Sequence, residues 1–448
     1  MNNYVKSVLN DLKEKYPWQE EFLQAATEVL ESLGVVFEKD SKYEEHKILE
    51  RIVEPERIIK FRVPWQDDEG NYHVNVGYRV QFNSAIGPYK GGLRFHPTVN
   101  ESILKFLGFE QIFKNSLTGI PMGGGKGGSN FDPRGKSDDE IMRFCQSFMT
   151  ELFRHVGAYT DVPAGDIGVG GREIGYLFGQ YKRLANEWTG VLTGKDHKWG
   201  GSLIRPEATG FGATFFAKEM LKANKDSLEG KNVALSGFGN VAWGAAQKVT
   251  ELGGKVITLS GPDGYIYDPE GIGTEEKWEY MLEMRASGRD KVKDYADKFG
   301  VEFFEGERPW KRKEIDIAIP AATQNELFED DAKALVKNNA IALAEAANMP
   351  CTLEAMEILR DGDILYAPGK AVNAGGVATS GLEMAQNSQF IFWTEEKVEE
   401  ELHKIMVNIH NSCLEASKEY GLGSDYVAGA NIAGFKKVAD SMIDQGLV

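Results

Sequence analysis

The sequence predicts an α/β protein of two domains, the second built on a mostly parallel, doubly wound sheet. Its 448 residues exceed what one compact core usually holds, so two or three domains are expected. From about residue 200 onward, short apolar strands alternate with helices, the pattern of a parallel sheet with helices on its faces. The stretch GGSLIRPEATGFG is rich in glycine, and we place the boundary between domains 1–200 and 201–424 there.

The first domain is expected to mix helices and strands. Apolar residues recur at helical spacing between charges up to about residue 60, which predicts helices. Beyond them we expect two strands split by the turn-forming DDEGN, and then two helices. These strands and helices are expected at residues 58–63, 73–82, 102–119 and 137–157.

The second domain shows short apolar runs bounded by turn signals. Runs of this length and composition, separated by helical patterns, indicate strands of a parallel sheet. The strands are expected at residues 232–236, 255–260, 314–319, 340–344 and 364–367, with a helix at 240–252.

Composition excludes several classes of function. The net charge of −17 opposes binding to nucleic acid or to an anionic membrane, whose phosphates it would repel. The three cysteines show no CxxC spacing and the histidines no ligand spacing, so we expect a reduced compartment and no metal. No apolar run approaches the length of a membrane span, and the charged N-terminus lacks the apolar core of a signal peptide. We therefore expect a cytoplasmic protein.

The most specific local signal is a dinucleotide-binding fingerprint within residues 231–261. A strand runs into Gly237-x-Gly239-x-x-Ala242, followed by a helix and a second strand. In such a turn the first glycine makes the bend, the second lets the backbone approach a pyrophosphate, and the third small residue lets helix pack on strand. The helix N-terminus then offers N–H groups to the phosphates. The contacts expected at this turn come from Gly237, Phe238, Gly239, Asn240, Val241 and Ala242.

The end of the second fingerprint strand favours NAD over NADP. The acidic residue common at this position is missing, and Gly261 stands there instead. Asp263 follows closely enough to reach a ribose hydroxyl or to shape a turn. No Arg or Lys follows closely enough to bind a 2′-phosphate, so NAD is the expected cofactor and NADP the alternative.

Three lysines in the first domain stand out against the acidic background. Lys126 lies in what we interpret as a glycine-rich loop, PMGGGKGG, which is no phosphate loop because Ile120 and Gly127 occupy positions that need Gly and Ser or Thr. Lys90 lies in PYKGGLRF and Lys114 in a predicted helix. Two of them have a plain alternative. Lys90 could be a solvated loop cation, and Lys114 could be the i,i+4 partner of a surface glutamate. Asp166, in VPAGD, has the alternative of a turn residue.

At this point the chain resembles a known family, the hexameric glutamate dehydrogenases of the Glu/Leu/Phe/Val dehydrogenase group. The resemblance runs from about residue 45 to the C-terminus and rests on many motifs in the same order and spacing. They read PYKGGLRF, FEQIFKNSL, PMGGGKGG, DVPAGDIGVGGREIGY, GSLIRPEATGFG, SGFGNVAWGAA, AEAANMP and NAGGVATSGLEMAQN. The resemblance implies interconversion of L-glutamate with 2-oxoglutarate and ammonia, by a homohexamer. It also implies an N-terminal substrate domain to which residues 425–448 return, and an active site in the cleft between the domains.

The resemblance also implies residue roles. The matching motifs give Lys126 as catalytic lysine and Asp166 as its proton-handling partner. Substrate contacts are implied at Lys90, Gly91, Gln111, Lys114, Gly165, Arg205, Val377 and Ser380, with Lys90 and Ser380 gripping the γ-carboxylate across the cleft. Cofactor contacts are implied at Thr209, Asp263, Asn348 and Asn373, beside the glycine turn.

Within this resemblance the chemistry explains an unusual lysine setting. Water must attack the imine left by hydride transfer, and an ordinary lysine, with a pKa near ~10.4, is protonated at neutral pH. Burial, together with the nearby Lys90 and Lys114, would lower the pKa of Lys126 and make it a base.

Two other functions remain open from the sequence. A dehydrogenase for leucine, valine or phenylalanine would keep Lys126 and lack the γ-carboxylate lysine, whereas Lys90 and Ser380 are present. A non-catalytic dinucleotide-binding sensor would be expected to lose Lys126 or Asp166, and both are present.

Overall fold

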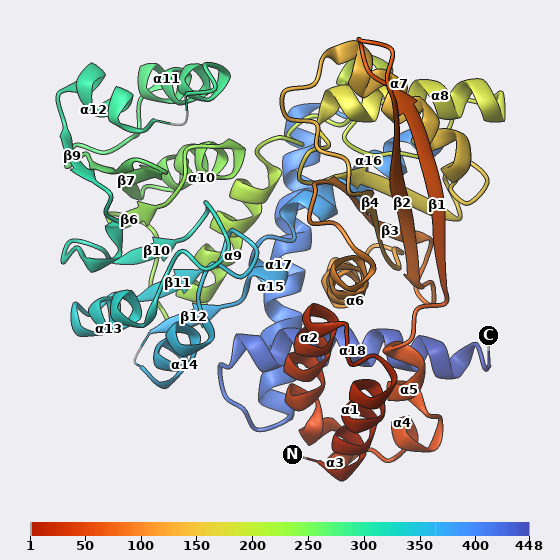
Figure 1. Ribbon diagram of the computed structural model, residues 1–448. Coiled ribbons are helices and arrows are strands. Elements are labelled where there is room, and N and C mark those ends of the chain that lie inside the picture. Colours follow the sequence, from red (N-terminus) through yellow and green to blue (C-terminus); the bar gives the residue numbers. More distant parts are fainter. Residues whose placement is uncertain (1, 290, 363, 448) are drawn as a thin grey trace. The chain divides into compact units, whose positions relative to one another are not determined.

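The computed structural model describes residues 2–289, 291–362 and 364–447, which fold as two compact units. The first unit contains the chain through Leu203, then Ser380–Val398 and the residues from Asn431 onward; the second contains Ile204–Thr379 and Glu399–Ala430. The first unit therefore also takes up residues 380–398, which the sequence prediction left in the second domain. In Figure 1 each unit is built around its own sheet.

The sheet of the first unit has strand order β1-β2-β4-β3-β5. The expected hairpin is confirmed: β1 and β2 pair antiparallel from Arg57↔Gln81 to Gln66↔Tyr72. Strand β3 pairs parallel with both β4 and β5. The strands are β1 (Arg57–Gln66), β2 (Tyr72–Asn83), β3 (Tyr89–Phe95), β4 (Gly124–Ser129) and β5 (Asp161–Gly165).

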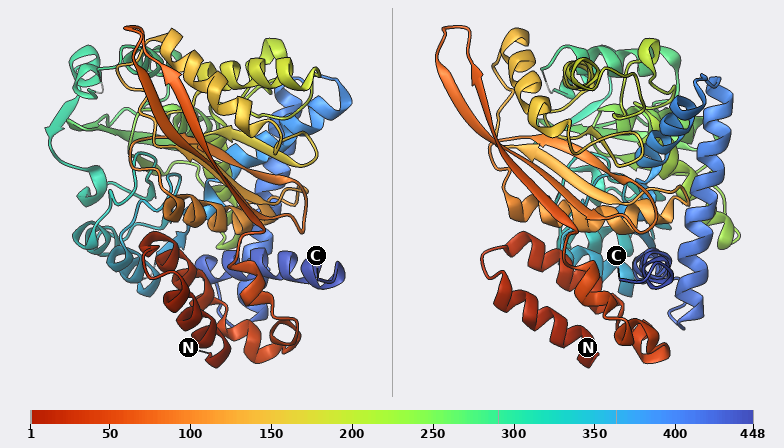
Figure 2. Two further views of the ribbon diagram at one scale, coloured as in Figure 1. Left: turned by 45° about the vertical axis from the view of Figure 1, so that its right-hand side comes forward. Right: turned by 90° about the vertical axis from the view of Figure 1, so that its right-hand side faces the viewer.

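Helices cover both faces of this sheet, as Figures 1 and 2 show. Phe82 of β2 packs against Phe109 of α6 (Glu101–Leu117), whereas Phe95 of β3 joins a core with α7 (Asp138–Leu152) and α8 (Gly171–Ala185). Helix α7 begins at a capping box and ends at Leu152, so the helix expected at 137–157 is shorter than predicted.

The helices at the two ends of the chain pack together in the first unit. The ring of Phe435, in α18, lies against those of Phe37 and Tyr43, with centroids 5.6 and 5.2 Å apart. The N-terminal helices predicted up to residue 60 end at Ile52. They are α1 (Asn3–Lys15), α2 (Glu20–Ser32), α3 (Gly34–Lys39), α4 (Lys42–Glu45) and α5 (Ile48–Ile52), and the last long helices of the chain are α16 (Gly375–Gln389), α17 (Glu395–Glu419) and α18 (Tyr426–Asp444).

The second unit is a doubly wound α/β unit with strand order β12-β11-β10-β6-β7-β8-β9. Strands β12 through β7 run parallel, as predicted, whereas β8 and β9 add an antiparallel edge that was not predicted. Its strands are β6 (Asn232–Leu235), β7 (Lys255–Gly261), β8 (Gly264–Tyr267), β9 (Glu302–Glu305), β10 (Ile317–Ile319), β11 (Ala342–Ala344) and β12 (Leu365–Ala367). Its helices are α9 (Ala208–Ala223), α10 (Asn240–Glu251), α11 (Glu275–Ala286), α12 (Lys293–Phe299), α13 (Glu329–Lys337), α14 (Leu353–Asp361) and α15 (Gly369–Val372).

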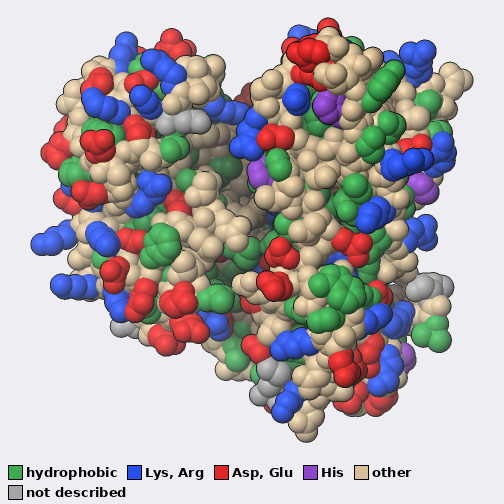
Figure 3. Space-filling view, viewed as in Figure 1, with side chains coloured by type: hydrophobic (Ala, Val, Ile, Leu, Met, Phe, Trp, Pro, Cys, Tyr) green, Lys and Arg blue, Asp and Glu red, His purple; other side chains and the backbone are tan. Residues whose placement is uncertain are grey.

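The surface carries charges of both signs. Figure 3 shows Lys and Arg side chains interspersed with Asp and Glu on the face that it draws. Within the described residues, no helix combines the length and apolar content needed to cross a membrane.

Candidate active site and dinucleotide site

Lys126 lies in the middle of a buried strand, so the glycine-rich loop expected around it is wrong. Strand β4 pairs with β2 through Val80↔Lys126 and is buried throughout. Its glycines are required by close packing. A Cβ on Gly124 would lie 2.5 Å from Ile112 of α6, and one on Gly128, at φ +154°, would lie 2.1 Å from a backbone oxygen of the neighbouring strand. Glycine therefore brings helix and strands tightly around one lysine.

The ammonium of Lys126 is paired with the carboxylate of Asp166. Its Nζ lies 2.9 Å from Oδ1, and the Nε of Arg94 donates to Oδ2 at 2.7 Å. The side chains of Lys126 and Asp166 are 6% and 19% exposed. Asp166 directly follows β5, where its backbone oxygen accepts from Val169 N at 2.9 Å. The backbone of Asp166 therefore does form a turn, while its carboxylate belongs to a partly buried Arg–Asp–Lys cluster.

Burial and neighbouring cations tune both members of this pair. Burial lowers the pKa of Lys126, Asp166 opposes the shift, and the charges of Arg94 and Arg79 add to it. For Asp166, burial raises the pKa, but Lys126 and Arg94 outweigh it and hold the pKa below its ordinary value. Asp166 therefore stays ionised, and Lys126 gives up its proton more readily than an exposed lysine.

Arg79, on strand β2, is a second positively charged residue of this sheet and is held in a fixed position. Its guanidinium and the carboxylate of Asp161 form a fully buried ion pair, with Arg79 Nε 2.9 Å from Asp161 Oδ2. Its Nη1 also donates to the backbone oxygen of Gly91 at 3.0 Å. This pairing holds the centre of β3 in place next to Lys126.

Lys90 is a buried strand residue, so its interpretation as a solvated loop cation is wrong. It lies in β3, is 1% exposed, and its Nζ donates to Thr193 Oγ1 at 2.7 Å. Because strand side chains alternate, Lys90 and Arg94 share one face of β3. Gly92 lies between these two residues, and a Cβ on Gly92 would lie 2.9 Å from Asp166 Cβ. Lys90 and the Lys126–Asp166 pair thus line the same side of the sheet.

Ser380 belongs to the same unit as Lys90, so the expectation that these residues meet across the two domains is wrong. One turn further along α16, Glu383 accepts from the backbone N of Gly194 at 2.9 Å and pairs with Lys195 at 2.8 Å. These bonds fix the segment that carries Thr193 to the helix that carries Ser380. Lys90, Thr193 and Ser380 are thereby tied to one scaffold.

The remaining predicted substrate residues of the first unit surround this face. Gln111 and Lys114 are half-buried on α6, and Gln111 Nε2 donates to Asn115 Oδ1 at 2.7 Å. Asn115 in turn donates to the backbone oxygen of Lys90 at 3.0 Å. Gly91 lies in β3 and Gly165 ends β5, paired beside Leu93. Arg205 and Val377 lie in the second unit.

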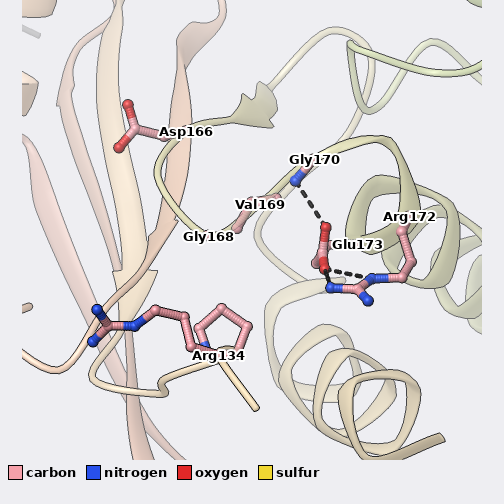
Figure 4. Close-up of a pocket in the computed structure, with 8 residues that line it drawn as sticks. Arg134, Asp166, Gly168, Val169, Gly170, Arg172 and Glu173 are labelled. Atoms are coloured by element: carbon pink, nitrogen blue, oxygen red, sulfur yellow. Dashed lines mark hydrogen bonds and ion pairs between the residues drawn. The ribbon is translucent and has the colours of Figure 1, made fainter. Parts of the chain in front are cut away.

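A cavity of about 470 Å³ lies beside the turn that carries Asp166. It is lined by Pro133, Arg134, Asp166, Gly168, Val169, Gly170, Arg172 and Glu173. In Figure 4 the Asp166 carboxylate points away from Arg172 and Glu173, which pair with each other. Glu173 also accepts from Gly170 N at 2.8 Å and so caps α8. The cavity thus borders the turn on the side away from the carboxylate.

The glycine fingerprint forms the expected turn between β6 and α10. Gly237 has φ +77°, a conformation that favours glycine, and Gly239 precedes the first helical residue, Asn240. A Cβ on Gly239 would meet no atom within 4 Å, so the exposed backbone of this turn is open to a ligand. Phe238 and Ala242 are buried, and Val241 is half-buried in the first turn of α10.

Two of the other predicted cofactor residues, Asn348 and Asn373, are hydrogen-bonded to each other. Asn373 Nδ2 donates to Asn348 Oδ1 at 2.8 Å, while Asn373 Oδ1 is buried and has no hydrogen-bond partner among the described residues. A Cβ on Gly376 would lie 2.7 Å from the hydroxyl of Thr209 and 3.6 Å from the guanidinium of Arg205. An unpaired buried acceptor together with an open glycine turn fits a dinucleotide whose carboxamide can donate a hydrogen bond. No cluster of three or more metal-ligating side chains occurs among the residues described.

Two residues of this site were missed by the sequence analysis. Arg94 lies within the quoted PYKGGLRF motif, and its even spacing from Lys90 on a strand was the signal that could have revealed it. Thr193 had no sequence signal, because only the fold brings residues 191–196 to Lys90.

Together, the fold and these side chains define a two-domain α/β protein with a Rossmann-like second unit and a lysine–aspartate ion pair in the first. Family models match over most of the chain: Glutamate/Leucine/Phenylalanine/Valine dehydrogenase at residues 200–446, and the Glu/Leu/Phe/Val dehydrogenase dimerisation domain at 55–183. The chain belongs to this Glu/Leu/Phe/Val dehydrogenase family.

Its relatives include enzymes named for either cofactor. The NAD-specific glutamate dehydrogenase of Clostridium symbiosum is 60% identical, with 100% of both chains covered. The NADP-specific glutamate dehydrogenase of Haemophilus influenzae is 57% identical, with 98% of each covered. A solved glutamate dehydrogenase structure is 60% identical, with a TM-score of 0.98 and 100% of each chain covered.

Proposed function

We propose that this chain is a glutamate dehydrogenase that interconverts L-glutamate with 2-oxoglutarate and ammonia, with NAD as preferred cofactor and NADP also accepted. The observation that carries this proposal is the buried Lys126–Asp166 pair, 2.9 Å apart, on the same side of the sheet as the buried cation of Lys90. A pair of this kind performs acid–base chemistry, and a buried cation nearby selects a substrate with a second carboxylate.

Lys126 is the base for the water that attacks the substrate imine. Because its pKa is lowered by burial and by Arg94 and Arg79, a neutral amine is available at lower pH than for a free lysine. Asp166, held between Lys126 and Arg94, handles the proton of the departing amine. The close packing of β4 keeps these groups in a fixed geometry, which is the main requirement for efficient proton transfer.

Lys90, Thr193 and Ser380 grip the γ-carboxylate of glutamate. The Lys90 ammonium is already oriented by Thr193 at 2.7 Å, and Glu383, on the same helix as Ser380, accepts from the backbone N of Gly194, next to Thr193. Lys114 and Gln111 hold the α-carboxylate end, and Gly91, Gly165, Arg205 and Val377 complete the substrate contacts. A leucine, valine or phenylalanine side chain would bring no carboxylate to the buried Lys90 ammonium, which disfavours these substrates.

The dinucleotide is held by the second unit. The N-terminus of α10, with Gly237, Gly239 and Asn240, would hold its pyrophosphate. Thr209 and Asn348 would contact the cofactor, Asn373 would lie near the nicotinamide side, and Asp263 at the ribose side. When bound, the dinucleotide supplies the acceptor for the hydride of the substrate α-carbon.

We further propose a cytoplasmic homohexamer. The cysteines Cys145, Cys351 and Cys413 are all buried and free, which suits a reducing compartment. The first unit carries the domain that its family model describes as the dimerisation domain.

A spectrophotometric assay tests the proposal. Purified protein is mixed with glutamate, leucine, valine or phenylalanine, each with NAD and with NADP, and formation of reduced nicotinamide is followed. Turnover of glutamate far above the other three is expected. Turnover of an aliphatic or aromatic amino acid instead would identify another specificity in the family, and dinucleotide binding without any turnover would identify a sensor.

A further inference from the structure

The carboxyl end of β7 is built from two segments that lie far apart in the sequence. Strands β7 and β8 are joined by a tight hairpin with Gly261 paired to Gly264. Beyond β9 the chain returns to this hairpin, where Gly306 N donates to the backbone oxygen of Asp263 at 2.9 Å. The residues that follow Gly306 therefore lie beside the strand end where a dinucleotide fold places the adenosine ribose.

A side chain at Gly261 would crowd its neighbours at this strand end. A Cβ on Gly261 would lie 2.8 Å from Asp263 Oδ1 and 3.1 Å from Phe238 Cε1. The Asp263 carboxylate thus occupies the space that an acidic side chain at position 261 would enter. Both of its oxygens already accept backbone N–H bonds, from Val292 and Lys293, each at 3.0 Å. Two such bonds stabilise the charge of Asp263 and restrict its orientation.

A cation also stands at this strand end. Arg308 Nη1 donates to the backbone oxygen of Gly261 at 3.1 Å, and at 3.4 Å to that of Glu307. The Arg308 side chain is half-exposed. In the part of the chain that the structure describes, both of its hydrogen bonds come from Nη1, which leaves Nη2 and Nε as donors for a ligand. No basic residue directly follows the strand in the sequence, and Arg308 comes 47 residues after Gly261.

We propose that Arg308 forms a 2′-phosphate subsite at the end of β7, through which this chain binds the adenosine part of NADP-type dinucleotides. This inference rests on the proposed dinucleotide-dependent function and specifies its cofactor range. A guanidinium presents a planar fork of donors that matches a phosphate, and it carries its charge at every physiological pH. Asp263 opposes the same phosphate, so the two residues together give NAD preference with NADP still accepted.

The test measures binding of adenosine fragments and needs no turnover. Adenosine 2′,5′-bisphosphate and 5′-AMP are titrated into the whole protein by isothermal calorimetry at fixed ionic strength. The variants are Arg308→Gln, Arg308→Lys and Lys311→Gln. Lys311→Gln is the matched control, because this substitution removes one charge from the same segment and the Lys311 side chain is 63% exposed.

The bisphosphate is expected to bind Arg308→Gln about tenfold more weakly than wild type, as the loss of a charge-assisted hydrogen bond implies. Binding of 5′-AMP should stay within about twofold, since it lacks the 2′-phosphate. Arg308→Lys, which keeps the charge, should fall between wild type and Arg308→Gln. Lys311→Gln should leave both affinities unchanged.

Three results would overturn the subsite: equal weakening of both ligands by Arg308→Gln, no weakening of either, or the same bisphosphate loss in Lys311→Gln. The outcome is separate from that of the proposed function. A protein that fails to oxidise glutamate can still show the Arg308 effect, and an active enzyme with unchanged fragment binding would refute the subsite alone.

Discussion

The Nζ of Lys126 lies 2.9 Å from Oδ1 of Asp166, and the second oxygen of that carboxylate is held by Arg94. One carboxylate thus bridges two cations in a nearly buried site. If Lys126 loses its proton, Asp166 keeps the Arg94 partner, so no buried charge is left unpaired. This arrangement allows Lys126 to change its protonation state during a reaction without disturbing its neighbour.

Replacing Lys126 with alanine should remove activity and leave the fold intact. Asp166 would keep its ion pair with Arg94, so the fold loses no essential partner. We expect kcat to fall by several orders of magnitude, since a positioned acid–base group contributes about 10²–10⁴-fold. Steady-state kinetics, with circular dichroism and NAD binding as folding controls, measures this. A variant that keeps a tenth of wild-type kcat would exclude Lys126 as the base, and Lys182→Ala, at an exposed helix position, serves as the control.

Replacing Asp166 with serine should slow turnover severely and leave glutamate binding close to normal. In the proposed mechanism the Asp166 carboxylate handles a proton, whereas other residues hold the substrate carboxylates. Measurement of kcat and KM separates the two roles. An almost unchanged kcat with a raised KM would make Asp166 a binding or structural residue instead.

Replacing Arg94 with methionine should move the pH–rate profile. The charge of Arg94 lowers the pKa of Lys126, so its removal raises that pKa. Because the neutral amine is the active form, activity at neutral pH should fall and the rising limb should move to higher pH, by about one unit or more. Arg94→Lys keeps the charge and should keep the profile. A limb that is unmoved, or that moves to lower pH, would contradict the tuning of Lys126 by Arg94.

Much of the scaffold could be predicted from the sequence because its signals are local. The DDEGN turn between β1 and β2 and the Gly237 turn between β6 and α10 each depend on residues close in the chain. The strand β4 was mistaken for a loop, since five glycines in PMGGGKGG favour a loop by propensity. Its strand conformation depends on pairing with β2 and on helix α6, which propensity does not contain.

Motifs pointed to Lys126 and Asp166, whereas Arg94 was overlooked within a motif and Thr193 and Arg308 lie in no motif. Lys126 and Asp166 lie 40 residues apart, and their pairing was expected from the family resemblance. Thr193 reaches Lys90 across 103 residues, and Arg308 reaches Gly261 across 47. Neither contact has a local pattern, because each depends on strands of one sheet bringing distant segments together.

NAD should be preferred over NADP in the wild-type enzyme. Asp263 lies at the end of β7 and repels a 2′-phosphate. Asp263→Asn removes the charge and keeps an oxygen to accept a backbone N–H. Because exposed charge pairs contribute up to about 1 kcal/mol, this substitution should raise kcat/KM with NADP several-fold. Values of kcat/KM with both cofactors, for wild type and variant, measure this. Comparable wild-type values for NAD and NADP would refute the preference.

Glutamate should be selected through Lys90 and Ser380. Norvaline, which ends where the γ-carboxylate begins, would bring a methyl group to the buried Lys90 ammonium in place of a carboxylate. Sites built around such a contact reject analogues that lack it by roughly 10⁴–10⁵-fold, so norvaline should be a very poor substrate. Replacing Lys90 with leucine and Ser380 with valine should lower kcat/KM for glutamate and raise it for norvaline, because an apolar pocket suits an apolar side chain.

The measurement is kcat/KM for both amino acids on wild type and double variant, with Lys182→Ala as an exposed-lysine control. Because Lys90 is 1% exposed and bonded to Thr193, the leucine replaces a buried side chain, so thermal melting is measured alongside. A side chain that only fills space would change the two substrates alike. A glutamate-to-norvaline ratio within about threefold of wild type, a change in discrimination under ~0.7 kcal/mol, would show that Lys90 and Ser380 do not form the γ-carboxylate pocket.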